Sequence, residues 1–256
     1  MEDVVFNIFK KPRLKRGTLI EGLPGIGLVG KLAADHIVEE FKTEKICDLY
    51  SPLFPPQVNV KEDCTVELVK NELYQTRLGR ENVIILVGDF QGITPDSQYI
   101  LSEKILDFSI SLGVKRVITL GGYGTGDLTK EPRVFGAATS VNIVSEFKKY
   151  GVEFRSGGSI VGASGILLGM SKFKGLDGVC LMGETHGQII DAQSAKSILK
   201  VLMKVFDIDI DLAKMDEKLK DTEEAISELT RLIEMERTGY MDMQDKNIGE
   251  VSKYIR

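Results

Sequence analysis

The chain has 256 residues, of which 43% are hydrophobic and 28% are charged, as is usual for a globular protein that folds without disulfide staples. Its formal net charge of −5 gives it no overall electrostatic reason to bind nucleic acid or an anionic membrane. No apolar run approaches the roughly 18 residues of a membrane span, and the first residues do not resemble a signal peptide. We therefore expect a cytoplasmic protein.

The first half of the chain alternates strand and helix signals. Short apolar runs predict strands at residues 17–22, 45–50 and 82–88, and the last run is typical of a strand buried on both faces. Apolar residues at helical spacing predict a helix over residues 28–41. Residues 65–78 alternate in polarity around Asn71, which indicates a β-hairpin.

The second half continues the alternation. Thr94 and Pro95 are typical of a helix start, and that helix is predicted to end near Leu112. Further strands are predicted at residues 114–120, 152–155 and 178–183, and further helices at residues 138–150, 162–170 and 189–206. A glycine run at 121–126 is expected to close the strand before it. This alternation predicts an α/β domain over residues 1–211, with a mostly parallel sheet flanked by helices.

A different pattern begins after Asp211. Apolar residues recur at alternating spacings of three and four, interrupted only by Thr222, which predicts a C-terminal helix over residues 212–238. Its seam would supply oligomer contacts through Leu212, Met215, Leu219, Ile226, Leu229 and Ile233. The polar residues 239–256 are predicted to form a flexible tail.

Three glycines between the first strand and the first helix permit a nucleotide-binding interpretation. Gly25, Gly27 and Gly30 match the GxGxxG pattern, and Asp48 lies about where a ribose-binding acid would follow. The same glycines also suit a tight turn with close helix–sheet packing. We favour packing, because a proline within the turn removes an N–H donor and Leu32 replaces the Ser or Thr of a phosphate loop.

One group of side chains is a candidate for acid–base chemistry. Glu184 and His186 follow the buried strand at 178–183, and Asp191 lies shortly beyond. The carboxyl end of a strand is where α/β sheets place their sites, so these residues could transfer a proton. No nucleophile motif or metal-ligand spacing accompanies them. We therefore favour a structural role, with no cofactor, no metal and no catalysis.

The cysteines also argue against a metal or disulfide framework. Cys47, Cys64 and Cys180 are far apart and contain no CxxC spacing. Such a pattern is typical of a protein kept reduced.

An ordered series of motifs resembles archaeal members of the proteasome assembly chaperone 2 family, over about residues 17–212. The series comprises Glu21–Lys31 (EGLPGIGLVGK), Leu53–Pro56 (LFPP), Gly88–Gln91 (GDFQ), Thr119–Gly122 (TLGG), Ile160–Leu168 (IVGASGILL) and Cys180–Thr185 (CLMGET), with Asp191. The resemblance implies a phosphorylase/hydrolase-like α/β fold, a homo-oligomer, and action on the proteasome core particle without catalytic residues. The alternative is a small-molecule enzyme or nucleotide-binding protein that uses the two candidate sites above.

The last residues also resemble part of a family feature. Archaeal relatives can end in a hydrophobic residue, a tyrosine and one further residue, which dock between α-subunits of the core particle. Here Tyr254 takes the hydrophobic position, Ile255 stands where tyrosine is expected, and Arg256 carries the terminal carboxylate. We interpret these three residues as a weaker docking motif for the proteasome α-subunits.

Overall fold

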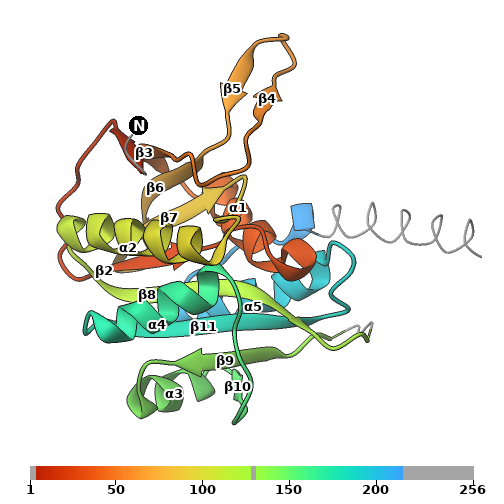
Figure 1. Cartoon of the computed structure of the whole chain (residues 1–256). Helices are drawn as coiled ribbons and strands as arrows, with labels where there is room; N and C mark the ends of the chain where they lie inside the picture. The colour runs from red at the N-terminus through yellow and green to blue at the C-terminus, as the bar shows by residue number, and fades with distance from the viewer. Residues whose placement is uncertain (1–3, 128–130, 216–256) are drawn as a thin grey trace, which may run out of the picture.

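The computed structural model describes residues 4–127 and 131–215, which form a central sheet covered by helices on both faces (Figure 1). The strands are β1 (Val5–Ile8), β2 (Gly17–Glu21), β3 (Glu44–Tyr50), β4 (Val58–Val60), β5 (Val66–Leu68), β6 (Asn71–Leu78), β7 (Glu81–Gly88), β8 (Val114–Gly124), β9 (Val134–Ala138), β10 (Glu153–Phe154) and β11 (Asp177–Thr185). The helices are the short 3-10 turn η1 (Ile26–Leu28), α1 (Val29–Glu40), α2 (Pro95–Leu112), α3 (Val141–Lys148), α4 (Ala163–Phe173) and α5 (Ala192–Phe206).

Within the described residues the main sheet has nine strands, in the order β1-β3-β6-β7-β2-β8-β11-β9-β10. Its centre, β7-β2-β8-β11, is parallel, as predicted from the buried apolar runs. Antiparallel pairs extend it toward β1 on one side, and β9 pairs antiparallel to β11 on the other. The predicted α/β fold is confirmed, with parallel pairing concentrated at the centre of a mixed sheet.

Two hydrophobic cores lie on opposite faces of this sheet. On one face, α1, α3 and α5 pack through residues such as Ile37, Phe147 and Leu202. On the other, α2 and α4 pack through residues such as Leu106 and Leu167 (Figure 1). None of the helices in the described ranges is long and apolar enough to cross a bilayer.

The start of α2 follows the predicted capping chemistry. The Thr94 side chain accepts a hydrogen bond from the Ser97 N–H, and the Ser97 hydroxyl accepts one from the Thr94 N–H. Pro95 occupies the first turn, where its missing N–H costs nothing. Gly113 ends the helix with φ 102°, a left-handed conformation that glycine adopts without strain.

The predicted hairpin at residues 65–78 is wrong. Its first part forms β5, which pairs with β4 in a separate two-stranded ribbon. Its second part forms β6, which begins at Asn71 and pairs with β3 and β7 in the main sheet. Continuous alternation therefore concealed two strands that belong to different sheets.

Several element limits also differ from prediction. Strands β1, β4 and β9 were not predicted, and β9 displaces the start of α3 from residue 138 to Val141. Strand β8 continues through Gly121 to Gly124, because β11 pairs with it along that length. Helix α5 starts at Ala192, because the Asp191 side chain caps it.

Candidate functional site

The glycine turn between β2 and α1 is closely packed against β8 and β11. Gly27 has φ 62°, and a Cβ there would lie 3.0 Å from the Thr185 hydroxyl. A Cβ on Gly30 would lie 2.3 Å from the Leu120 carbonyl oxygen. Gly25 has no such constraint, since its φ of −156° is extended and its Cβ position has only ordinary contacts. Close packing therefore accounts for two of the three glycines.

A buried carboxyl group, which the sequence analysis did not single out, lies at the end of β2. Glu21 is fully buried; its Oε1 accepts a hydrogen bond from the Leu23 N–H at 3.0 Å, and its Oε2 accepts one from the Ser164 hydroxyl at 3.0 Å. Burial raises the pKa of this carboxyl group to about 7. An acidic residue directly after an apolar strand was the available sequence signal.

Gln91 joins the glycine turn to α4. Its Nε2 donates to the Pro24 carbonyl oxygen at 2.6 Å, and its Oε1 accepts from the Ala163 N–H at 2.9 Å and from Gln98 Nε2 at 3.1 Å. Ala163 is the first residue of α4. Gln91 thus bonds the first backbone N–H of α4 and links that helix to the glycine turn.

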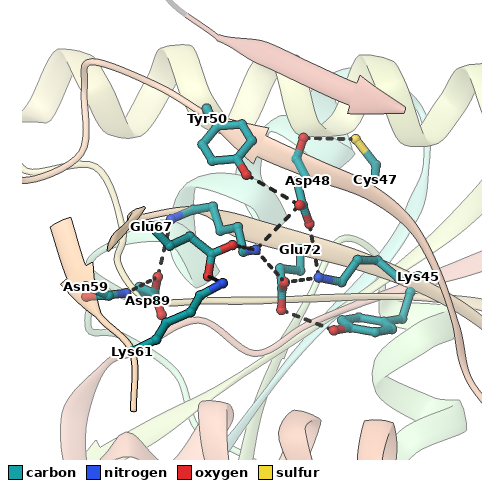
Figure 2. A network of polar contacts seen from close by, with 11 residues as sticks. Lys45, Cys47, Asp48, Tyr50, Asn59, Lys61, Glu67, Glu72 and Asp89 are labelled. Carbon is teal, nitrogen blue, oxygen red and sulfur yellow. Dashed lines mark hydrogen bonds and ion pairs between the residues drawn. The ribbon is translucent and has the colours of Figure 1, made fainter. Parts of the chain in front are cut away.

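The proposed ribose-binding acid is remote from this turn. Strands β6 and β7 lie between β3, which carries Asp48, and β2. The Asp48 carboxylate instead lies 3.2 Å from Lys45 Nζ and 3.5 Å from Lys70 Nζ (Figure 2). The structure therefore does not bring Asp48 together with Gly25, Gly27 and Gly30.

The same charge network fastens the β4–β5 ribbon to the body. Lys70 pairs with Glu67 on the ribbon as well as with sheet carboxylates, and Asn59 Nδ2 donates to Asp89 Oδ2 at 3.1 Å (Figure 2). The other face of the ribbon is apolar, and its side chains are between 48% and 70% exposed: Val58, Val60, Val66 and Leu68. In Figure 1 the ribbon projects from the body.

Glu184 forms a bidentate ion pair with Arg133, so its carboxylate is not free to act as a base. Arg133 Nε donates to Oε2 at 2.9 Å, and Arg133 Nη2 donates to Oε1 at 2.6 Å. These hydrogen bonds lower the pKa of the Glu184 carboxyl group. The pair ties the end of β11 to the start of β9.

The other two acid–base candidates do not complete a site with Glu184. Asp191 Oδ1 accepts from the Ser194 N–H at 2.8 Å and so caps α5. His186 Nδ1 is buried and has no hydrogen-bond partner among the described residues. In those parts of the chain, no ion pair or hydrogen bond links the three side chains.

The described residues contain no group of three or more His, Cys, Asp or Glu side chains that could hold a metal ion. Cys47 and Cys180 are buried and Cys64 is exposed, and all three are free. Burial raises the pKa of the Cys180 thiol to about 12, so that it remains a thiol.

The start of the predicted C-terminal helix packs on its own domain. Met215 is fully buried in the hydrophobic core formed with α1, α3 and α5, and Leu212 packs against the same core. His36 Nε2 lies 2.7 Å from the Asp211 carbonyl oxygen and holds this segment on α1. The remaining seam positions Leu219, Ile226, Leu229 and Ile233, and the tail residues Tyr254, Ile255 and Arg256, lie outside the described residues.

Comparison with known proteins gives consistent matches over most of the chain. The model of the PAC2 family matches residues 19–230. The uncharacterized protein MJ1210 of Methanocaldococcus jannaschii is 42% identical over 222 residues, which are 86% of each chain.

Two solved structures from Pyrococcus furiosus share the fold. PbaB, an archaeal proteasome activator, is 38% identical with a TM-score of 0.84, covering 90% of this chain and 100% of its own. PbaA, an archaeal homolog of proteasome-assembly chaperone, is 27% identical with a TM-score of 0.73, covering 91% of this chain and 99% of its own.

Proposed function

Because this chain belongs to the PAC2 family, we propose that it is a non-catalytic chaperone or adaptor that binds the α-subunits of the proteasome core particle. The observation that carries the proposal is the similarity to PbaB, a proteasome activator, at 38% identity along the whole length of that protein. Such a protein would act in the cytoplasm, where its partner is made.

The geometry of the carboxyl end of the sheet favours binding over chemistry. Glu184 is held by Arg133, and Asp191 caps a helix. The Gly25–Gly30 turn packs on β8, and Gln91 bonds the N–H at the start of α4. Within the described residues these groups already have structural partners, which supports a binding role over an enzyme or a nucleotide-binding protein.

The proposed mechanism joins a homo-oligomeric body to its C-terminal tails. Tyr254 and Ile255, next to the carboxylate of Arg256, have the chemistry for capture in an apolar pocket with a basic floor. One tail would bind weakly, because ordering a polypeptide arm costs conformational entropy. Several tails on one oligomer raise the effective concentration and strengthen binding without new contacts.

Deleting Tyr254–Arg256 tests the proposal. With α-subunits immobilised on a surface, we expect the full chain to be captured and the truncated chain to lose at least about tenfold in affinity, the loss of roughly 1.4 kcal/mol or more. Sedimentation should give the same mass for both chains. A matched variant with Lys253→Ala retains the three terminal residues and should bind like the wild type.

Two results would contradict the proposal. If the truncated chain binds α-subunits as tightly as the full chain, the docking element is not the tail. If neither chain binds, the α-subunit is not the partner. Micromolar binding of ATP or NAD in a calorimetric titration would favour the nucleotide-binding alternative instead.

A further inference from the structure

An open groove of about 630 Å³ lies between α4, β9 and the loop that leads from β10 to α4. It is on the same face of the sheet as α4, where Figure 1 shows no helix over β9 and β10. A volume of this size is typical of a binding site for a small ligand or a short chain segment. Neither candidate site from the sequence includes it.

The floor of the groove is apolar. Phe135 and Ala137 of β9 line it together with Met182 of β11, which pairs with Phe135. Val134, which precedes Phe135, points the other way and joins the hydrophobic core formed with α1, α3 and α5. The alternation of the strand thus places an apolar surface beside the edge of the sheet, where none of the described helices covers it.

The walls are built largely from glycine. Gly165 and Gly169 of α4 line one wall, and Gly157 and Gly158 line the opposite wall. A Cβ added at Gly169 would meet nothing within 4 Å, so internal packing does not require that glycine. Walls without side chains let another polypeptide approach closely.

The charged side chains in the groove are cationic. Among the described residues its lining contains Arg155 and Lys172 and no carboxylate, although the chain as a whole has a net charge of −5. The Arg155 guanidinium lies 4.4 Å from the centre of the Phe135 ring, which holds it above the apolar floor, and 3.9 Å from the Glu153 carboxylate outside the groove lining. Lys172 forms no ion pair within residues 4–127 and 131–215.

Large apolar side chains are exposed at both ends of α4. Val161, just before the helix, is 88% exposed, and Phe173, its last residue, is 91% exposed. Exposed apolar groups beside an apolar groove are typical of a surface that another chain covers. The groove is therefore suited to a partner that carries apolar side chains and carboxylates.

The segment with alternating three- and four-residue apolar spacing, residues 212–238, has that chemistry, and we call it the heptad segment. Between residues 221 and 236 it carries Ile226, Leu229 and Ile233 on its seam. Six acidic side chains and one basic side chain, Arg231, accompany them: Asp221, Glu223, Glu224, Glu228, Glu234 and Glu236. An acidic segment with an apolar stripe complements an apolar groove with a cationic rim.

The position of the segment's start favours its insertion into another copy of the chain. Met215 is buried in the hydrophobic core formed with α1, α3 and α5, whereas α4 packs on the opposite face of the sheet. Reaching the groove of its own chain would take the segment around the edge of the sheet. A second copy presents the segment without that detour.

We propose that the groove between α4 and β9 binds residues 221–236 of a second copy of this chain. Arg155 and Lys172 would pair with its carboxylates, and Ala137, Met182 and Phe173 would cover its apolar seam. This inference rests on the homo-oligomer of the proposed function and assigns to it one contact surface.

Disulfide trapping in the full-length protein tests the inference. In a Cys64→Ser background, which removes the exposed native thiol, one preparation carries Gly169→Cys and a second, differently tagged preparation carries Ile226→Cys. After mixing and mild oxidation, we expect a mixed disulfide between the two tags. Ser145→Cys on the exposed surface of α3 replaces Gly169→Cys as the matched control and should give at least about tenfold less.

A second measurement uses charge and keeps the test independent of thiol chemistry. Arg155→Glu with Lys172→Glu should reduce the trapped disulfide and raise the concentration needed for oligomer formation by about tenfold or more, since like charges across an interface repel. Lys148→Glu with Lys149→Glu at the C-terminal end of α3 makes the same change of charge outside the groove. It should leave both readouts unchanged.

The inference is overturned if trapping at Gly169→Cys does not exceed trapping at Ser145→Cys, or if the groove and control charge changes have equal effects. Failure of the α-subunit capture assay with trapping intact would remove the proposed function alone. Failure of trapping with α-subunit capture intact would remove only this groove contact.

Discussion

Individual glycines in this protein have different roles, although the sequence shows them alike. Gly30 and Gly169 both lie inside helices, α1 and α4 respectively. Gly30 faces the backbone of β8 at a distance that admits no Cβ, and Gly169 faces open space. The two positions therefore form a matched pair for testing the packing interpretation of the glycine turn.

We expect Gly30→Ala to lower the free energy of unfolding by about 1–3 kcal/mol, because the new methyl group must displace the backbone of β8. Gly169→Ala should leave stability unchanged or raise it by up to about 1 kcal/mol, since alanine favours the helix. Urea denaturation of both variants measures the difference. Equal effects would contradict the packing role of Gly30.

The buried Glu21 carboxyl group leads to a second prediction, which concerns how the free energy of unfolding depends on pH. Its pKa is raised from 4.5 to about 7 in the folded protein, so the unfolded chain loses this proton first as the pH rises. Stability from this group is therefore complete below pH 4.5 and is lost as the pH rises through about 7. Over that window the loss is about 3 kcal/mol.

Glu21→Gln keeps the size of the side chain and removes the titration. Relative to this variant, the wild type should lose about 3 kcal/mol of unfolding free energy between about pH 4.5 and about pH 8. Denaturation with urea at the two pH values gives the comparison, and Glu62→Gln on an exposed turn is the control. A parallel pH dependence for Glu21→Gln and wild type would rule out this role of the carboxyl group.

Among the elements, the β4–β5 ribbon depends most on charge. Its polar side chains face the body through the Lys70 network (Figure 2). Its apolar side chains are exposed. A two-stranded ribbon is marginally stable alone. The ion pairs of Lys70, whose side chain is only 13% exposed, therefore hold the element in place.

We expect Lys70→Met to destabilise the protein by about 2 kcal/mol, because the partly buried Asp48 loses one of its partners. Amide exchange should rise in Val58–Val60 and Val66–Leu68 more than in the main sheet. Lys61→Met removes a 50% exposed lysine that also pairs with Glu67 and should cost no more than about 0.5 kcal/mol. Similar exchange in the two variants would show that the network does not anchor the ribbon.

For the molecule as a whole, we expect oligomer formation to depend on the heptad segment. Met215, its second seam residue, is buried against the domain that precedes it. The later seam residues continue the same spacing in the sequence. An isolated helix of this length is marginal in water, so the seam requires a packing partner.

Leu219→Asp with Ile226→Asp should reduce the oligomer mass in sedimentation by at least one subunit, because two charges would enter the apolar contact. Lys220→Asp with Ser227→Asp adds two acidic residues outside the seam and should leave the mass unchanged. An unaltered sedimentation profile and full thermal stability for the seam variant would refute a packed seam.

The sequence by itself determined features that depend on nearby residues. The capping of α2 by Thr94 and the central apolar strands follow from local chemistry. Family membership could also be predicted, because the ordered motifs stand along most of the chain. Local patterns are readable because their partners lie within a few positions in the sequence.

Only the tertiary structure decided which distant residues meet. Arg133 and Glu184 are 51 positions apart, and strand pairing turns a candidate base into a structural ion pair. Strands β6 and β7 separate Asp48 from the glycine turn, and one alternating stretch divides between the ribbon and the main sheet. Strand order and pairing are set by the burial of all the elements together, and no single segment contains that information.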